Sequence, residues 1–214
     1  MDSLVINPSI LYFGTPVALI TTVQPDGSAN ISPMSSAWAL DDRVVLGLGG
    51  CGQCVANLRR LGECVINLPD ATLWQRVEAI AGTTGSHPVP EYKRAMGYRF
   101  EPDKFARAGL TATPSQVVTP PRIAECPLQL EARVVAMHVC GDDPIDPTLI
   151  VETRVERVHA HAGIVVPGTQ HVDVAAWSPL LYVFRHYFGE ARRLGQTFRA
   201  GSPESAGAGR LDAG

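Results

Sequence analysis

The residue types best suited to binding chemistry are concentrated in two short stretches near the start of the chain. Residues 30–36 (NISPMSS) are expected to form a loop that carries amide and hydroxyl side chains, and residues 49–54 (GGCGQC) a second, glycine-dense loop. A helix is predicted directly after this loop, with Val55 and Leu58 on one face and Gly62 at its end. The first amides of a helix lack intrahelical partners, and the helix dipole favours negative charge there. We therefore predict that the two stretches bind one phosphate-bearing ligand, the alternative being that the glycines only turn the chain.

The cysteines allow a second interpretation of the glycine-dense loop. Cys51 and Cys54 have the Cys-x-x-Cys spacing of dithiol redox sites, at the start of a predicted helix. No alternation of strands and helices surrounds them, and no second cysteine pair completes a zinc site. A plain loop role is therefore favoured over redox chemistry. Cys64, Cys126 and Cys140 lie in strand-like runs and are expected to be buried as small apolar residues.

The histidines offer a candidate metal site, which the sequence does not favour. His159 and His161 are two residues apart, so they share one face of a predicted strand. No cluster of carboxylates or cysteines lies near them in the sequence to complete a ligand set. We expect no metal at these residues, nor at His138 or His171.

Short strands joined by turns account for most of the chain. Residues 17–23 are apolar and β-branched, and the Gln-Pro-Asp-Gly sequence at 24–27 is a turn signal. Residues 43–48 are a further strand candidate. Residues 128–136 alternate apolar and polar side chains, which predicts a half-buried strand, and a second long strand is expected over 148–161. The pattern indicates a mainly β protein.

The middle of the chain lacks the strand pattern of the rest. Asp70 can cap a helix that ends near Gly82. Residues 83–109 are polar and aromatic and contain several prolines, so we expect a long irregular segment that acts as a lid or binding element. His87, Lys93 and Lys104 are candidate ligand contacts there, although solvated loop side chains are the more common role of such residues.

Composition sets the outer limits. The chain has 214 residues, 45% hydrophobic and 18% charged, with a mean hydropathy of +0.06 and a net charge of −3. This balance indicates neither a nucleic-acid partner nor binding to an anionic membrane. The first residues lack a secretory signal, and no apolar run approaches the ~20 residues of a membrane helix. We expect one domain over residues 1–198, a flexible Gly/Ala/Ser-rich tail over 199–214, and a cytoplasmic location.

An ordered set of motifs runs through most of the chain. These are PVALITT, PDGSANISPMSSAWA, VVLGLGG and NLRRLGECVINLP, followed by TTG at 83–85, DKF at 103–105, AGLT at 108–111, PPRIAECPLQLEARV at 120–134 and WSPLLYVFRHYFG at 177–189. In this order they resemble the flavin reductase-like family, whose members include flavoredoxin. The resemblance implies a six-stranded antiparallel Greek-key split β-barrel with a few peripheral helices. It also implies bound FMN, or FAD, with NADH or NADPH as co-substrate, and a homodimer with flavin at the subunit interface.

The resemblance also assigns candidate site residues. The expected flavin contacts are Asn30, Ser32, Pro33, Met34, Ser35, Ser36, Gly50, Cys51, Gly52, Gln53, Cys54, Asn57, Thr84 and Tyr187. His87, His186 and Tyr187 are expected near the flavin face. Many relatives have a basic residue, a histidine and a threonine where this chain has Gly52, Gln53 and Cys54. That departure removes a cation and a hydroxyl from the phosphate loop, so Lys93, Lys104 or an arginine must compensate, or flavin binds weakly.

Three functions are consistent with this assignment. The first is an NAD(P)H:flavin reductase that transfers hydride from nicotinamide to flavin N5 and supplies reduced flavin to a partner monooxygenase. The second is a flavoprotein with permanently bound FMN that acts on another electron acceptor or an organic substrate. The third is a binding module that has lost flavin. Hydride transfer needs no acid–base residue of the protein, so the lack of a recognisable triad does not argue against an enzyme.

Overall fold

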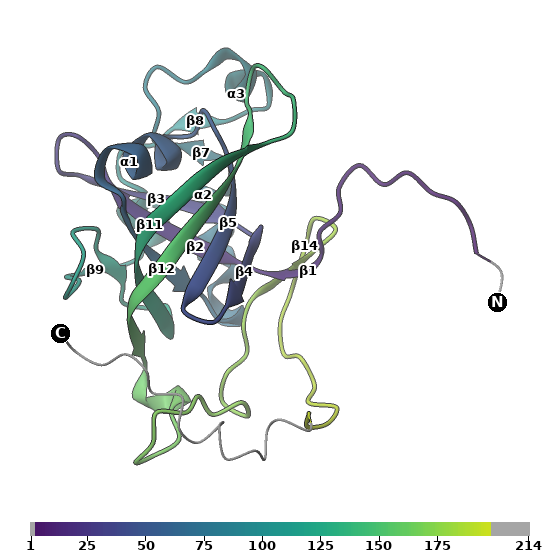
Figure 1. Cartoon of the computed structure of the whole chain (residues 1–214), viewed down its shortest axis with the longest axis vertical. Coiled ribbons are helices and arrows are strands. Elements are labelled where there is room, and N and C mark those ends of the chain that lie inside the picture. Colours follow the sequence, from purple (N-terminus) through teal and green to yellow (C-terminus); the bar gives the residue numbers. More distant parts are fainter. Residues whose placement is uncertain (1–2, 198–214) are drawn as a thin grey trace.

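Seven antiparallel strands form the main sheet of residues 3–197, the part of the chain that the computed structural model describes (Figure 1). Their order in the sheet is β3 (Ala29–Met34), β2 (Ala18–Val23), β6 (Glu63–Leu68), β11 (Leu128–Cys140), β12 (Thr148–Ala160), β5 (Arg43–Gly49) and β4 (Ala37–Leu40). The two edge strands, β3 and β4, are joined by only Ser35 and Ser36, so the sheet must curl until its edges meet. The expected split barrel is confirmed, with a seventh strand because residues 37–40 pair with β5.

Smaller sheets and helices surround the barrel. A three-stranded sheet contains β1 (Phe13–Pro16), β13 (Leu181–Val183) and β14 (His186–Phe188), and two-stranded pairs join β7 (Thr83–Thr84) to β8 (Arg99–Phe100) and β9 (Ala112–Thr113) to β10 (Arg122–Ile123). The helices are α1 (Gln53–Leu61), α2 (Trp74–Ala81), α3 (Glu91–Ala95) and α4 (Lys104–Ala108), with 3₁₀ turns η1 (Ala71–Leu73) and η2 (Ala162–Ile164).

Strand β2 separates two hydrophobic cores because it is buried on both faces. Ala18 and Ile20 pack in one core with side chains of α1, whereas Leu19 packs in the other with side chains of α2 and α4. Successive side chains of a strand point to opposite faces, so this single strand anchors helices on both sides. The arrangement brings the starts of α1 and α4 close to β3, where the predicted ligand site lies.

The local signals at the ends of the helices are confirmed. Gly62 ends α1 with a positive φ of 72°, and its amide donates to the carbonyl of Leu58. Asp70 accepts a hydrogen bond from the amide of Thr72, and the expected helix after it begins with one 3₁₀ turn before α2. These caps fix where each helix begins and ends.

Three expectations about local structure are wrong. Residues 29–34 form strand β3 rather than a loop, because they pair along the full length of β2. Residues 83–109 are not irregular: they contain α3 and α4, the latter capped by Asp103. Cys140 is exposed because it lies at the tip of the β11–β12 hairpin, although Cys64 and Cys126 are buried as expected.

Strand β11 also departs from simple alternation. Register shifts follow Glu131 and Val134, and Glu131 is fully buried. Its carboxylate accepts hydrogen bonds from the amides of Gln116 and Val117 and lies 2.6 Å from Nε2 of His159. These contacts hold the pKa of Glu131 below its usual value despite burial. His159 is thus engaged by a carboxylate, and the described residues contain no group of three or more metal-ligating side chains.

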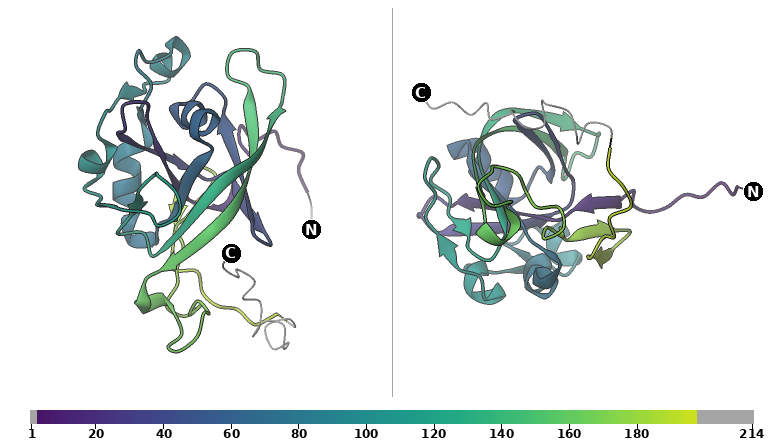
Figure 2. Two further views of the ribbon diagram at one scale, coloured as in Figure 1. Left: turned by 60° about the vertical axis from the view of Figure 1, so that its left-hand side comes forward. Right: turned by 90° about the horizontal axis from the view of Figure 1, so that it is seen from below.

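The N-terminal end of the described chain lies apart from the barrel. Residues 3–12 extend away from it, and the tip of the β11–β12 hairpin lies at the same end of the molecule as α3 (Figures 1 and 2). Among the described residues, no helix combines the length and apolar character needed to cross a membrane. The expected tail over 199–214 lies outside the described residues.

Candidate functional site

Two adjoining cavities, which together we call the groove, are lined by residues of β3, β5 and α2, among others. The first, which we call the polar cavity, has a volume of about 290 Å³ and is lined by Ser32, Gly52, Gln53, Cys54, Val55, Thr83, Thr84, Gly85, Lys93, Met96, Lys104 and Asp146. The second, the tyrosine cavity, has a volume of about 420 Å³ and is lined by Tyr12, Val17, Met34, Ser35, Ser36, Gly47, Val77, Tyr182 and Tyr187. Pro33, Leu48, Gly49, Ala81 and Tyr98 line both cavities, so the two lie next to each other.

The start of α1 faces the polar cavity. Gln53, Cys54 and Val55 form the first turn of this helix and line the cavity wall. Their amides belong to the group that a helix start leaves without intrahelical acceptors. The first turn therefore offers backbone donors and the positive end of the helix dipole to a ligand in the cavity.

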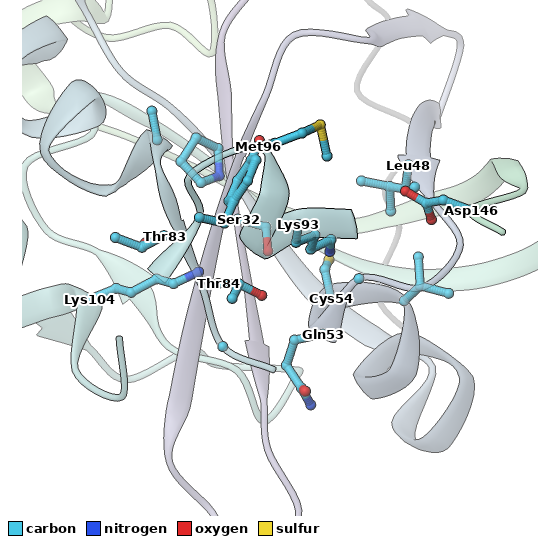
Figure 3. A pocket seen from close by; sticks show the side chains of 17 residues that line it. Ser32, Leu48, Gln53, Cys54, Thr83, Thr84, Lys93, Met96, Lys104 and Asp146 are labelled. Carbon is cyan, nitrogen blue, oxygen red and sulfur yellow. The ribbon is translucent and has the colours of Figure 1, made fainter. Parts of the chain in front are cut away.

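Two ammonium groups also line the polar cavity. The sequence has 18 lysine and arginine residues, of which only Lys93 and Lys104 are lysines, and both line this cavity. In Figure 3, Lys104 and Asp146 lie on opposite sides of the view, with Ser32, Thr84 and Lys93 between them. A cavity with two flexible cations and a helix start is suited to an anionic group.

Lys104 is not the solvated loop side chain that the sequence favours. It is 3% exposed, and its Nζ donates to the carbonyl of Ile31 over 2.7 Å. Burial lowers the pKa of this lysine from 10.5 to about 8, so it remains largely protonated at neutral pH. A buried cation with one protein acceptor can take an anionic ligand as its second partner.

The glycine-dense loop contacts its own chain more than the groove. The amide of Gly50 donates to the carbonyl of Pro147 over 2.7 Å, and the amide of Cys51 donates to Oδ1 of Asp146 over 2.9 Å. Gly50 and Cys51 line neither cavity, because they pack on the tip of the β11–β12 hairpin. Of the predicted phosphate loop, Gly52, Gln53 and Cys54 reach the polar cavity.

Two predicted asparagines support the cavity from behind. Asn57 is 1% exposed, accepts from Nε2 of Gln53 and donates to Oγ1 of Thr22, so it orients Gln53 without lining the cavity. Asn30 is 2% exposed, and its Nδ2 donates to Oγ of Ser32. Its Oδ1 has no hydrogen-bond partner among the described residues.

Gly85 closes the floor beside Asn30. A Cβ at this glycine would lie 2.5 Å from Oδ1 of Asn30 and 3.2 Å from Cγ of Gln53. No larger residue fits there without moving the cavity wall, so the sequence Thr84-Gly85 can follow the groove closely.

Ser35 and Ser36 line the tyrosine cavity, together with three tyrosines that lie far from them in the sequence. Oγ of Ser36 donates to the hydroxyl of Tyr12 over 2.9 Å, and Ser35 lies beside it in the wall. The rings of Tyr12 and Tyr182 pack edge to face with centroids 5.5 Å apart. Tyr187 packs on Tyr182 in turn, and its hydroxyl donates to Glu78. Burial raises the pKa of Tyr187, so the ring remains a neutral donor.

Two other candidates, His87 and His186, line neither cavity, and a third, Cys54, lines the polar cavity without a reactive thiol. His87 is exposed, packs on the ring of Phe100 and lines neither cavity. His186 is exposed on β14. Burial raises the pKa of the Cys54 thiol to about 12, whereas a reactive dithiol needs a lowered thiol pKa.

Several lining residues are not marked by any motif in the sequence: Tyr12, Leu48, Val77, Met96, Tyr98 and Asp146. They come from five separate segments, and only the tertiary fold brings these together. Lys93 and Lys104 do stand out in the sequence, because they are the two lysines among 18 basic residues and all the others are arginines. Asp146 had no such signal.

Comparisons with known proteins bear on the family and the fold. The family model described as "Flavin reductase like domain" matches residues 10–191. The protein YdfE of Bacillus subtilis (strain 168), itself uncharacterised, is 44% identical over 195 residues, which is 91% of this chain and 93% of the relative.

Two solved structures share the fold over nearly the whole chain. Flavoredoxin of Desulfovibrio vulgaris (Miyazaki F) has a TM-score of 0.74 at 19% identity and covers 94% of this chain and 100% of its own. Nitrilotriacetate monooxygenase component B from Bacillus cereus has a TM-score of 0.72 at 18% identity and covers 92% and 100% respectively. At these identities the matches show the fold alone.

Proposed function

Since the chain belongs to the flavin reductase-like family, we propose that it is an NAD(P)H-dependent flavin oxidoreductase that uses FMN and binds it in the groove described above. The observation that carries this proposal is that a cation-lined polar cavity adjoins an aromatic cavity. A flavin mononucleotide has the same division, with a phosphate at one end and a planar ring at the other.

The residues of the groove fit such a group on three counts. The phosphate would lie in the polar cavity, where Lys104, Lys93 and the first turn of α1 supply positive charge. Ser32, Gln53 and Thr84 add hydroxyl and amide side chains to the same cavity, and these can donate hydrogen bonds to phosphate oxygens. Tyr12, Tyr182 and Tyr187 supply an aromatic wall for the ring.

The protein's own task in this chemistry is positioning. Bound FMN would supply the hydride-accepting ring, so no side chain has to act as an acid or base. The tyrosine cavity orients planar groups against one another and excludes water from their contact. Ser36 holds Tyr12 by a hydrogen bond, which fixes one side of that cavity.

A permanently bound FMN is the second candidate, and one observation favours it. The segment 83–104 supplies seven of the residues that line the polar cavity: Thr83, Thr84, Gly85, Lys93, Met96, Tyr98 and Lys104. A ligand that contacts so many residues of one segment exchanges slowly. In that case the electrons pass to another acceptor or an organic substrate, and FMN does not leave the protein.

Purification followed by gel filtration and an NAD(P)H oxidation assay separates the candidates. The reductase proposal predicts protein that loses its flavin and oxidises NADH or NADPH only when FMN or FAD is added. A yellow protein that keeps FMN through the column supports the second candidate. A colourless protein that neither binds flavin nor oxidises either nicotinamide with added flavin contradicts both, and leaves a binding module.

The N-terminal arm offers apolar side chains to a protein partner. Leu4, Val5 and Ile6 are 86%, 105% and 75% exposed on the arm of residues 3–12, and this arm leads directly to Tyr12 in the tyrosine cavity. Exposed apolar side chains in such a row favour a protein contact. We propose a homodimer in which a second copy covers this arm, so that flavin lies near the subunit interface. Light scattering on the full chain and on a variant lacking residues 2–11 tests this, with a dimer expected for the first and a monomer for the second.

The likeness to a component of nitrilotriacetate monooxygenase supports a further partner, an oxygenase that takes up reduced flavin. Oxygenase-dependent acceleration of NAD(P)H oxidation would be the sign of such a pair.

A further inference from the structure

The anion position of the glycine-dense loop is filled by a side chain of the protein itself. Oδ1 of Asp146 accepts the amide of Cys51 over 2.9 Å. Oδ2 lies 2.9 Å from the position that a Cβ at Gly49 would take, so the carboxylate is pressed against the loop. A loop of this kind, at a helix start, is where an external anion would otherwise bind.

Asp146 is fixed in this position and faces the ligand cavity. The carboxylate of Asp143 accepts the amides of Ile145 and Asp146, which shapes the hairpin tip that carries it. The side chain lines the polar cavity together with Lys93 and Lys104 (Figure 3). A ligand in this cavity therefore meets one negative and two positive side chains.

We propose that Asp146 is a specificity-determining residue that weakens the binding of flavins with a terminal phosphate and so keeps FMN exchangeable. This inference rests on the proposed function. Two negative groups in one partly enclosed cavity repel one another more strongly than they would in water. Riboflavin has the same ring and sugar chain without the phosphate, so the carboxylate should act on FMN and not on riboflavin.

The negative charge can be separated from the structural contact. The amide of Cys51 needs only an acceptor oxygen, and asparagine supplies one in nearly the same shape. Asp146→Asn therefore removes the charge and keeps the loop in place. Asp142→Asn is the matched control, because Asp142 is exposed on the same hairpin and lines neither cavity.

The experiment measures Kd for FMN and for riboflavin by quenching of flavin fluorescence in the wild type and both variants. We expect Asp146→Asn to tighten FMN about fivefold, to change riboflavin by less than about twofold, and Asp142→Asn to change neither. Thermal unfolding of each variant verifies that the fold is kept.

Two results would overturn the inference. An unchanged or weaker FMN affinity in Asp146→Asn means that the charge does not oppose the phosphate. An equal change in the affinities for FMN and riboflavin means that Asp146 acts on groups common to both ligands. If wild type and variant bind neither flavin, the proposed function fails and this inference fails with it, which is a distinguishable result.

Discussion

The glycine-dense loop at 49–54 and the segment at 83–104 lie at the same cavity but contribute to it in different ways. The loop has the pattern typical of a phosphate site, yet the amides of Gly50 and Cys51 donate to the β11–β12 hairpin. The segment has no recognised phosphate pattern, yet with α4 it brings both lysines of the chain to the cavity.

The difference follows from what each kind of donor requires. A buried backbone amide must find an acceptor in the folded protein, so a loop packed against a hairpin uses its donors internally. A lysine on a flexible stem can reach into a cavity and keep donors for a ligand; within the described part of the chain, the Lys104 ammonium group donates only to the Ile31 carbonyl. Anion binding is therefore better inferred from where the cations lie than from where the glycines lie.

Removing the Lys104 ammonium group should have the largest effect. We expect Lys104→Gln to weaken FMN by about tenfold or more, because a charge-assisted hydrogen bond is worth roughly 1.5–3 kcal/mol. Riboflavin affinity should be nearly unchanged, as measured by fluorescence quenching. Arg99→Gln is the control, since Arg99 is a cation of the same segment that lines neither half of the groove. An equal loss for both flavins would instead indicate a damaged cavity.

The pH dependence of FMN binding should be the next largest effect. The pKa of Lys104 in the free protein is about 8, and the protonated form favours the phosphate. FMN affinity should therefore be full below this pKa and fall as the pH rises above it, by up to about tenfold per pH unit. The phosphate itself has its second pKa near about 6 and is already a dianion there. Titrations of FMN and riboflavin across this range test the claim, and a parallel fall for riboflavin would refute it.

A methyl group at Gly85 should act on the cavity floor with an intermediate effect. Its Cβ would lie 2.5 Å from Oδ1 of Asn30, so the wall must move. We expect Gly85→Ala to weaken the binding of FMN and of riboflavin alike by about threefold to tenfold, because a displaced floor changes the cavity for both ligands. Both Kd values and the unfolding temperature are the measurements. Gly82→Ala, which meets no atom within 4 Å, is the control.

The smallest effect is expected at the glycine-dense loop itself. Cys51→Ala keeps the backbone amide that Asp146 accepts and removes only a thiol that points to the Ile145 carbonyl. FMN affinity should change by less than about twofold. A tenfold loss would show that the Cys51 thiol contributes to FMN binding and would contradict the minor role given to this loop.

Much of the fold could be predicted because its signals are local. The turn at Gly27, the helix end at Gly62 and the cap at Asp70 each follow from one residue's conformational or hydrogen-bonding preference. Glu131 could not be predicted as buried, because its burial depends on amides of Gln116 and Val117 that a distant loop supplies. The extent of β3 was also missed, since polar residues such as Asn30 and Ser32 do not show that a strand will pair.

The site was predicted only in part, for the same reason. Ser32, Pro33, Gln53 and Thr84 do line the groove, and the two serines at 35 and 36 lie in the tyrosine cavity. Asp146 could not be foreseen from its surroundings in the sequence, because its contact with Cys51 spans 95 residues. The burial of Lys104 likewise depends on α4 packing against β3, which no local pattern encodes.

The most direct test of the account compares FMN with riboflavin on the wild-type protein. If the cation-lined polar cavity holds the terminal phosphate, Kd for FMN should be at least about tenfold lower than Kd for riboflavin at neutral pH and low salt. The preference should shrink as salt is added. Equal affinities for the two flavins, or a preference that salt does not change, would contradict the assignment of the phosphate to this cavity.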